Sequence, residues 1–188
     1  MPDAGIVPGD VAVIGERART VLDADAVRAG IDRLAVRLTL ALGETNPLLV
    51  AVLQGGLYLS GQLMARLRFP LQQASVQVSR YGNATEGGAL RFLAPLSAEV
   101  TGRTVLLVDD IFDAGITLNL LASHLRERGA ARVVSAVLVR RQRADQTQPP
   151  PDFHLVECGE GWLIGCGMDY RGYWRNLPEI RMLQPGDT

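Results

Sequence analysis

The chain of 188 residues is the size of one domain with its own core, so we expect a single domain over residues 1–188. Its composition is 47% hydrophobic and 21% charged, and its net charge of −1 gives no general attraction to nucleic acid or to a membrane surface. No apolar run approaches the ~20 residues that span a bilayer, and we expect no export signal at the N-terminus.

The first part of the chain predicts an arm and a helix. Residues 1–14 are rich in glycine, proline and small side chains, and we expect them to form a loosely held arm. Apolar residues recur at three- and four-residue steps over 27–42, which predicts a helix. Asp23 or Asp25 can cap that helix, and Gly43 is expected to end it.

Strands and helices alternate along the rest of the chain. Continuous apolar runs predict three buried strands, at residues 47–53, 104–110 and 132–140. Helices are expected within 54–67, after a glycine turn, and at 115–129. A further strand is expected at 74–81, and a strand followed by a glycine turn is expected within 163–170. The glycine-rich segment 82–92 is expected to be a mobile loop ending in a short strand. This alternation indicates an α/β fold with a central parallel sheet flanked by helices.

The most informative segment is VLLVDDIFDAGITL, residues 105–118, in which an apolar strand runs directly into carboxylates. Ligands of parallel sheets bind beyond the carboxyl ends of the strands, where Asp109, Asp110 and Asp113 are expected. Backbone N–H groups at the start of the next helix favour an anion. The loop therefore suits a ligand that carries a phosphate together with a metal ion or a diol. As an alternative, Asp113 serves only to cap the helix.

This segment resembles the signature of type I phosphoribosyltransferases, which bind phosphoribosyl pyrophosphate (PRPP). LQGGLYLSGQL resembles the first loop of that family, and SRYGNATEGGALRF, which contains Arg80 and Tyr81, resembles its flexible second loop. The stretch 151–180 resembles the purine-binding hood of the hypoxanthine-guanine branch, with GMDYRGYWRN as its most specific piece. The resemblance implies the type I phosphoribosyltransferase fold, with a flexible antiparallel flap and a small hood formed by about 152–188 and the N-terminal segment.

The resemblance also implies an activity in purine salvage: the Mg²⁺-dependent transfer of phosphoribosyl from PRPP to hypoxanthine or guanine, giving IMP or GMP and pyrophosphate. It implies that Asp113 is the general base for the purine N7 proton. The implied PRPP site comprises Asp109, Asp110, Asp113, Ala114, Gly115, Ile116, Thr117, Gln54, Gly55 and Arg175. The implied purine site comprises Arg140, Trp162, Leu163 and Asp169, and the implied metal contacts are Asp169, Asp109 and Asp110.

The chain departs from the family pattern in its basic residues. All 19 are arginine, so the lysine that reads the purine 6-oxo group in this family has no direct counterpart. We expect Arg140 in that role because it directly follows an apolar run, with Arg141 as the alternative, since neighbouring strand residues face opposite sides. An arginine fork can donate to O6 and N7 of guanine or hypoxanthine, whereas the amino group of adenine is a donor. Ala114 and Gln54 stand where the family often has a hydroxyl residue and a lysine.

Two other functions fit parts of this pattern. A xanthine-preferring transferase would differ in how it reads the C2 edge of the base. Pyrimidine-operon regulators share the fold and the Asp-Asp pair but bind RNA; they usually lack an acid at the position of Asp113 and carry a basic face, so we favour the enzyme. We expect small-molecule substrates, no nucleic-acid or membrane partner, and a homo-oligomer, either a dimer or a tetramer. Cys158 and Cys166 are expected as reduced thiols in the cytoplasm.

Overall fold

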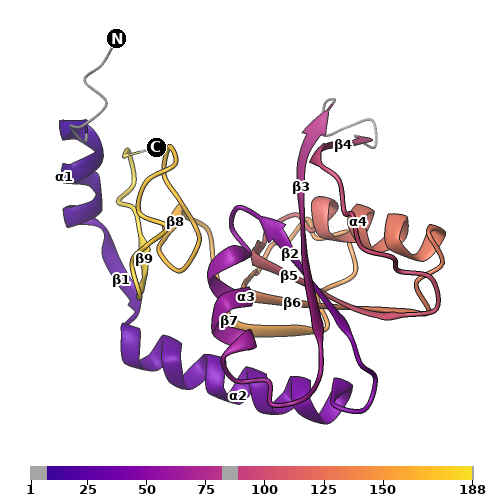
Figure 1. Ribbon diagram of the computed structural model, residues 1–188. Coiled ribbons are helices and arrows are strands. Elements are labelled where there is room, and N and C mark those ends of the chain that lie inside the picture. The colour runs from indigo at the N-terminus through magenta and orange to yellow at the C-terminus, as the bar shows by residue number, and fades with distance from the viewer. Residues whose placement is uncertain (1–7, 82–88, 188) are drawn as a thin grey trace.

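The computed structural model describes residues 8–81 and 89–187. A six-stranded sheet forms the larger part of the protein, and a separate three-stranded sheet lies beside it (Figure 1). The large sheet comprises β2 (Leu48–Leu53), β3 (Gln72–Tyr81), β4 (Ala89–Ala94), β5 (Thr104–Phe112), β6 (Arg132–Arg141) and β7 (Phe153–Cys158). The order is β4-β3-β2-β5-β6-β7, and all neighbours are parallel except the β3–β4 pair. The predicted α/β fold with a central parallel sheet is confirmed.

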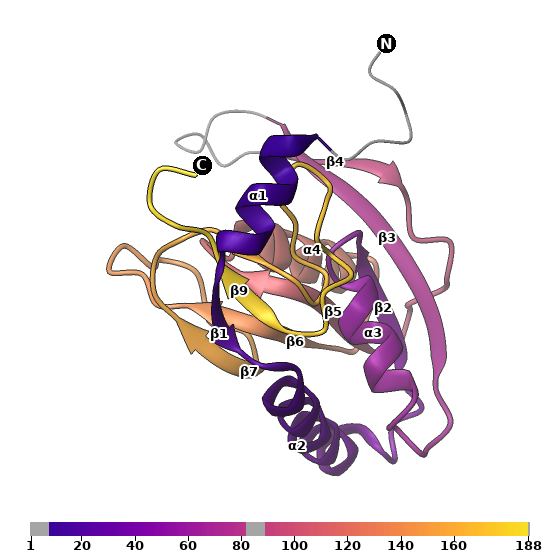
Figure 2. The same cartoon turned by 90° about the vertical axis from the view of Figure 1, so that its left-hand side faces the viewer.

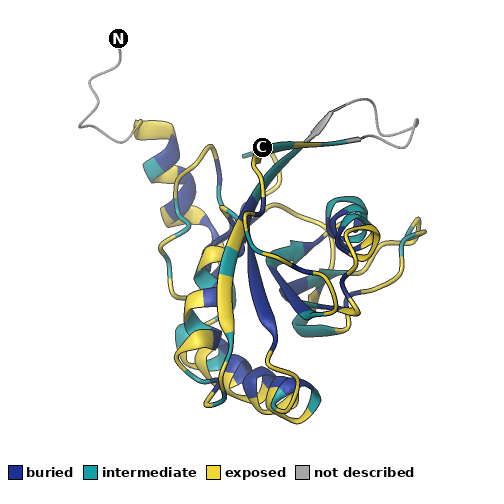
Figure 3. Cartoon of the chain, turned by 45° about the vertical axis from the view of Figure 1, so that its right-hand side comes forward, coloured by how far each residue is buried: buried dark blue, intermediate teal, exposed yellow. Residues whose placement is uncertain are grey.

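Helices cover both faces of this sheet. On one face, α2 (Ala24–Leu42) contacts β7 and α3 (Leu57–Met64), and α3 contacts β2 and β5. On the other face, α4 (Ile116–Glu127) contacts β4, β5 and β6. The strands are buried on both sides (Figure 3). Continuous apolar runs are therefore required in β2, β5 and β6, and the sequence contains them.

Helix α2 forms as its sequence predicts. The Asp23 side chain accepts a hydrogen bond of 2.8 Å from the Ala26 N–H, and Gly43 follows the last turn. The apolar stripe is buried against the sheet at Val27, Ile31, Leu34, Leu38 and Leu42. Among the described residues, no helix has the length and hydropathy that crossing a membrane requires.

Two leucines of α2 give a matched test of this packing. Leu38 is 0% exposed and Leu40 is 85% exposed. We expect Leu38→Ala to lower the free energy of unfolding by about 2–5 kcal/mol, because it leaves a cavity under the sheet. Leu40→Ala, which removes the same atoms from the opposite face, should change it by no more than about 0.5 kcal/mol. Urea titration of both variants measures the difference, and equal effects would contradict the observed orientation of α2.

The small sheet joins the two ends of the chain. Its order is β1 (Arg19–Leu22), β9 (Ile180–Met182) and β8 (Leu163–Ile164), all antiparallel. Helix α1 (Gly9–Arg17) lies beside it, as Figure 2 shows. We call the unit formed by α1, β1 and residues 162–187 the hood.

The expectation of a loose arm over residues 1–14 is wrong for its second half. Residues from Gly9 onward form α1, and Val11 and Ile14 are buried in the hood. The segment is rich in glycine and proline, which argued against a helix. Its apolar residues nevertheless have helical spacing, and they bury one face of this short helix. Residues 1–7 lie outside the described part of the chain.

The flap is described only at its two strands. β3 and β4 pair antiparallel, as expected, with Arg80 and Tyr81 at the end of β3. Residues 82–88, on which the predicted mobility depends, lie outside the described residues. β1 and β9 were not predicted, because each is a short strand without a continuous apolar run. The expected start of the hood at about residue 152 is too early, because Phe153–Cys158 form β7, an edge strand of the large sheet.

Candidate active site

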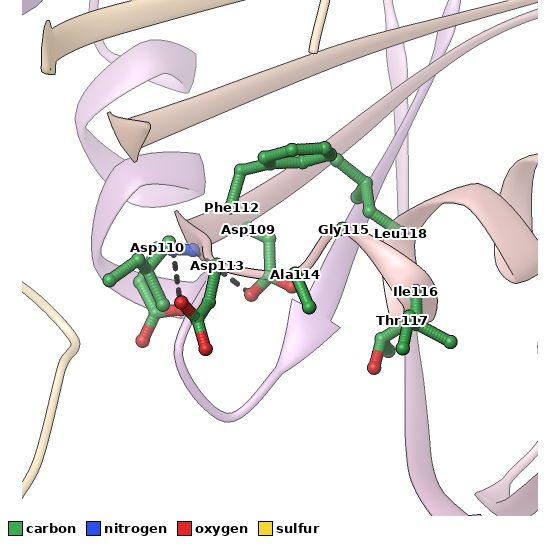
Figure 4. A pocket seen from close by; sticks show the side chains of 10 residues that line it. Asp109, Asp110, Phe112, Asp113, Ala114, Gly115, Ile116, Thr117 and Leu118 are labelled. Atoms are coloured by element: carbon green, nitrogen blue, oxygen red, sulfur yellow. Dashed lines mark hydrogen bonds between the residues drawn. The ribbon is translucent and has the colours of Figure 1, made fainter. Parts of the chain in front are cut away.

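The carboxyl end of β5 presents the two adjacent carboxylates. β5 extends two residues beyond the predicted end at residue 110, to Phe112, and pairs with β6 up to that residue. Both acids therefore lie within the strand, near its carboxyl end. The Asp110 N–H donates to the Asp109 carboxylate at 2.9 Å, and the Ile111 N–H donates to the Asp110 carboxylate at 2.7 Å. These bonds fix both side chains at the mouth of a pocket (Figure 4).

The loop after β5 forms a cradle for an anion. Gly115 adopts a left-handed conformation, with φ of 77°, immediately before α4, and no side chain among the described residues caps that helix. Asp113 is therefore not the helix cap, and its carboxylate is 53% exposed in the site. The first turn of α4 contains no acid, so its free N–H groups can receive a phosphate. The cradle is lined by Asp109, Asp110, Ile111, Phe112, Asp113, Ala114, Gly115, Ile116, Thr117 and Leu118.

The first loop packs directly on this carboxylate pair. It connects β2 to α3 through Gln54 and Gly55, and the peptide bond between Leu53 and Gln54 is cis. A Cβ added at Gly55 would lie 2.1 Å from the Asp110 carboxylate, so any side chain there would displace that acid. The loop backbone thus lies beside the carboxylates, as its predicted contact with PRPP requires.

The hood supplies a linked set of polar side chains. One nitrogen of the Arg175 guanidinium lies 2.6 Å from the Asp169 carboxylate, and another donates to the Gly167 carbonyl oxygen at 2.6 Å. The Arg175 Nε is buried and has no partner among the described residues. Trp162 donates its indole N–H to the Asp169 carbonyl at 2.6 Å. These contacts join the aromatic, the acid and the arginine that the sequence predicts as functional.

A second pocket lies between β5 and the hood. Its lining residues are Asp110, Ile111, Asp113, Arg141, Trp162, Leu163, Met168 and Asp169. The Trp162 side chain is 49% exposed and is not a core residue, so its face is available to a flat ligand. Asp113 lines both pockets, and its side chain therefore lies where the two pockets adjoin.

Of the two candidate arginines, the structure places Arg141, not the expected Arg140, in the lining of the second pocket. Arg140 forms an ion pair of 2.9 Å with Glu157 on the neighbouring strand β7 and does not line the second pocket. Arg141 lines it, lies 3.6 Å from Asp113, and donates to the carbonyls of Gly159 and Gly161. The position of Arg140 directly after the apolar run does not decide which side of the sheet it faces. Side chains do not alternate strictly just before it, because Leu138 and Val139 both pack into the same core cluster.

The structure adds two residues that the sequence reasoning missed. Arg143 lies 3.2 Å from Asp113 and also binds Asp145 through two hydrogen bonds. Met168 contributes an apolar surface to the second pocket. The run RRQR, 140–143, signals an arginine cluster, but only the turn after β6 brings its last member back to Asp113.

Burial dominates the electrostatics of the carboxylate pair. It raises the pKa of Asp109 well above the ordinary value, and the neighbouring Asp110 charge raises it further. Burial also raises the pKa of Asp110. The positive charge of Arg175 lowers both pKa values but does not outweigh burial. The free protein therefore holds two acids that a bound cation would stabilise in their ionised form.

This pKa shift predicts how stability depends on pH. The folded protein binds the Asp109 proton more tightly than the unfolded chain, so stability is lost as the pH rises from the ordinary value of 3.8 through the raised pKa. We expect Asp109→Asn, which cannot ionise, to raise the free energy of unfolding of the free protein at neutral pH. The gain should disappear below pH 3.8. Urea titrations across pH measure it.

The matched control for that experiment is Glu44→Gln, which removes an exposed carboxylate from the turn after α2. It should leave the pH dependence unchanged. A constant difference between Asp109→Asn and wild type at all pH values would contradict the raised pKa.

The donor set fits a metal ion that arrives with its substrate. No group of three or more His, Cys, Asp or Glu side chains that could hold a metal is found within residues 8–81 and 89–187. Mg²⁺ is commonly bound through one or two protein carboxylates together with substrate phosphates. Asp109 and Asp110, with their raised pKa values, provide such carboxylates.

Comparison with known proteins identifies the family. A model described as "phosphoribosyl transferase domain" matches residues 18–171. The chain belongs to the phosphoribosyl transferase domain family. The predicted resemblance to type I phosphoribosyltransferases is thereby confirmed.

Relatives within the phosphoribosyl transferase family are similar over almost the whole chain. A hypoxanthine-guanine phosphoribosyltransferase from Bacillus subtilis is 29% identical over 168 residues, covering 89% of this chain and 93% of the relative. A hypoxanthine-guanine-xanthine phosphoribosyltransferase from Tritrichomonas foetus is 27% identical, covering 93% and 96%. The solved hypoxanthine phosphoribosyltransferase from Trypanosoma cruzi, in complex with the product IMP, aligns with a TM-score of 0.84 at 25% identity, covering 90% and 96%.

Proposed function

We propose that this chain acts in purine salvage and transfers the phosphoribosyl group of PRPP to N9 of hypoxanthine or guanine, releasing pyrophosphate. The observation that carries the proposal is the pair of adjoining pockets, an anion cradle at the start of α4 and a flat pocket beside Trp162, with Asp113 lining both. The relatives are named as phosphoribosyltransferases of hypoxanthine and guanine, and these names support the same reaction.

The substrate orientation follows from the chemistry of each wall. The loop 113–117 receives the 5′-phosphate on its backbone N–H groups. Asp109 and Asp110 accept hydrogen bonds from the ribose hydroxyls. The first loop and Arg175 receive the pyrophosphate, whose negative charge matches the guanidinium. This orientation directs the anomeric carbon toward the second pocket, where the purine stacks on Trp162.

Catalysis then depends on charge and on one proton. Positive charge develops on the ribose while pyrophosphate leaves, and Arg175 stabilises the leaving group. Asp113 takes the N7 proton of the purine as the bond forms at N9. Mg²⁺, held by Asp109, Asp110 and Asp169, would supply further charge neutralisation on the pyrophosphate.

Arg141 determines the choice of base in this proposal. It is held by the hood carbonyls and by Asp113, and its remaining donors can reach the O6 of a 6-oxopurine. Adenine presents a donor at that position and is rejected. The backbone of Leu163 reads the C2 edge, so a xanthine-preferring transferase remains the alternative. The position of Asp113 in the purine pocket disfavours an RNA-binding regulator.

The proposal extends to the partners and the compartment of the protein. Its substrates are small molecules, it has no nucleic-acid or membrane partner, and it works in the cytoplasm as a homo-oligomer, either a dimer or a tetramer. Light scattering of the purified protein measures the assembly state.

One assay tests the proposed reaction. The protein is mixed with PRPP, MgCl₂ and each of hypoxanthine, guanine, xanthine and adenine, and pyrophosphate release is followed together with the nucleotide product. We expect release with hypoxanthine and guanine and none with adenine. Release with xanthine alone would support the xanthine-preferring alternative, and no release with any base would contradict the enzyme.

A further inference from the structure

Helix α1 contacts the part of the hood that carries Arg175. It lies before the residues 18–171 that match the family model, yet it is docked on the hood (Figure 2). Val11 and Ile14 of α1 belong to an apolar cluster to which Tyr170, Trp174 and Leu177 contribute. The helix therefore packs against the apolar side chains of the segment between Asp169 and Arg175.

One side chain makes the closest contact. The indole N–H of Trp174 donates to the Val11 carbonyl of α1 at 3.0 Å. A Cβ added at Gly15 would lie 2.4 Å from two carbon atoms of the indole, so the helix backbone touches the ring at that residue. The hydrogen bond and the contact with Gly15 thus hold the same part of the ring, around Nε1, Cε2 and Cζ2.

The backbone at Trp174 has an uncommon conformation. Its φ is 72°, in the left-handed region that residues other than glycine rarely adopt. Arg171, with φ of 52°, is in the same region and forms an ion pair of 2.8 Å with Asp10 of α1. Such backbones persist where the surroundings over-determine them, and α1 supplies two of the contacts that do so.

Arg175 follows Trp174 directly, so the direction of its side chain depends on that backbone. Its guanidinium lies against Asp169 and the Gly167 carbonyl, and its positive charge acts on the carboxylates of Asp109 and Asp110. A displacement of the indole therefore acts on the residue directly before this arginine.

We propose that α1 is a positioning element for the pyrophosphate end of the site. Trp174, locked between Val11 and Gly15, holds Arg175 in the direction that receives the pyrophosphate of PRPP. The inference rests on the proposed function only for the role of Arg175. Neither Trp174 nor Gly15 touches the substrate, and both act through Arg175.

The test compares the same substitution at two glycines of α1. Gly15→Ala places a methyl group against the indole, whereas Gly9→Ala meets open space in the same helix. Calorimetry with PRPP and MgCl₂ gives the affinity of each variant, and ribose 5-phosphate, which lacks the pyrophosphate, is the control ligand. We expect Gly15→Ala to weaken PRPP binding about tenfold or more, because small misplacements of a positioned group have large effects. Ribose 5-phosphate binding should be unchanged, and Gly9→Ala should match wild type for both ligands.

A double-mutant cycle separates positioning from a general loosening of the hood. In an Arg175→Ala background, Gly15→Ala should have no further effect on PRPP affinity, because it acts through the missing side chain. Should Gly15→Ala fail to fold, as judged by its melting curve, Trp174→Phe keeps a ring but removes the N–H that binds Val11. It should weaken PRPP binding in the same selective way. Wild-type PRPP affinity in either folded variant, equal losses for both ligands, or additive losses in the cycle would overturn the inference.

The binding measurements require no purine. If wild type binds PRPP but transfers its phosphoribosyl group to no 6-oxopurine, the proposed function fails while the inference about α1 remains testable.

Discussion

Asp113→Asn is expected to lower kcat by about 10²–10⁴-fold, the usual contribution of a general base. Asparagine keeps the size of the side chain and can still accept a hydrogen bond from Arg143, but it cannot take the N7 proton. PRPP affinity should be retained, because the phosphate is held by backbone N–H groups of the loop. Steady-state kinetics with hypoxanthine, together with PRPP calorimetry, measure both quantities.

Asp145→Asn is the matched control for that variant. Asp145 binds the same arginine, Arg143, but is 71% exposed and outside the purine pocket. It should leave kcat close to wild type. If Asp113→Asn lowered kcat no more than about threefold, the proton-transfer role would be excluded.

Arg141→Ala is expected to raise KM for hypoxanthine and guanine, with little change in KM for PRPP. Loss of a charged hydrogen bond of about 1.5–3 kcal/mol corresponds to a factor of about 10–150. Arg140→Ala, which removes the neighbouring guanidinium but only its ion pair with Glu157, is the matched control and should have no such effect. The reverse result would show that the base meets Arg140 after all. Equal KM values for wild type and both variants would mean that another group reads O6.

The sequence predicted the parts of the fold that depend on local pattern. The central strands are found within two residues of their predicted ends, because strands buried on both faces require continuous apolar runs. The start of α2 is found because Asp23 caps it. Helix α1 was missed because it is short and lies in a segment rich in glycine and proline. β1 and β9 have no strong pattern of their own and form because they pair with each other.

The same division applies to the site. Asp109, Asp110 and Asp113 could be predicted because carboxylates at the end of an apolar strand are costly without a ligand. The choice between Arg140 and Arg141 could not, because it depends on a local loss of alternation in β6. The contact between Gly15 and Trp174 has no signature in the sequence, since it joins two segments far apart in the chain. The glycine in α1 cannot by itself be read from the sequence as a site of close contact, because the residue that packs against it is not known from the sequence.

The pairing of β1 with β9 has a consequence for protein synthesis. Arg19 lies opposite Met182, so the pairing of these two strands cannot form until the ribosome has made the chain as far as Met182. The large sheet ends at Cys158 and can assemble earlier, since domains fold from the N-terminal side during translation. In the nascent polypeptide, the adjacent acids of β5 are thus in place before the hood, which contains Arg175 and Trp162, has folded. The hood can close only when β1 meets β9, and a stop codon shortly before Ile180 is expected to leave a folded large sheet without a complete hood.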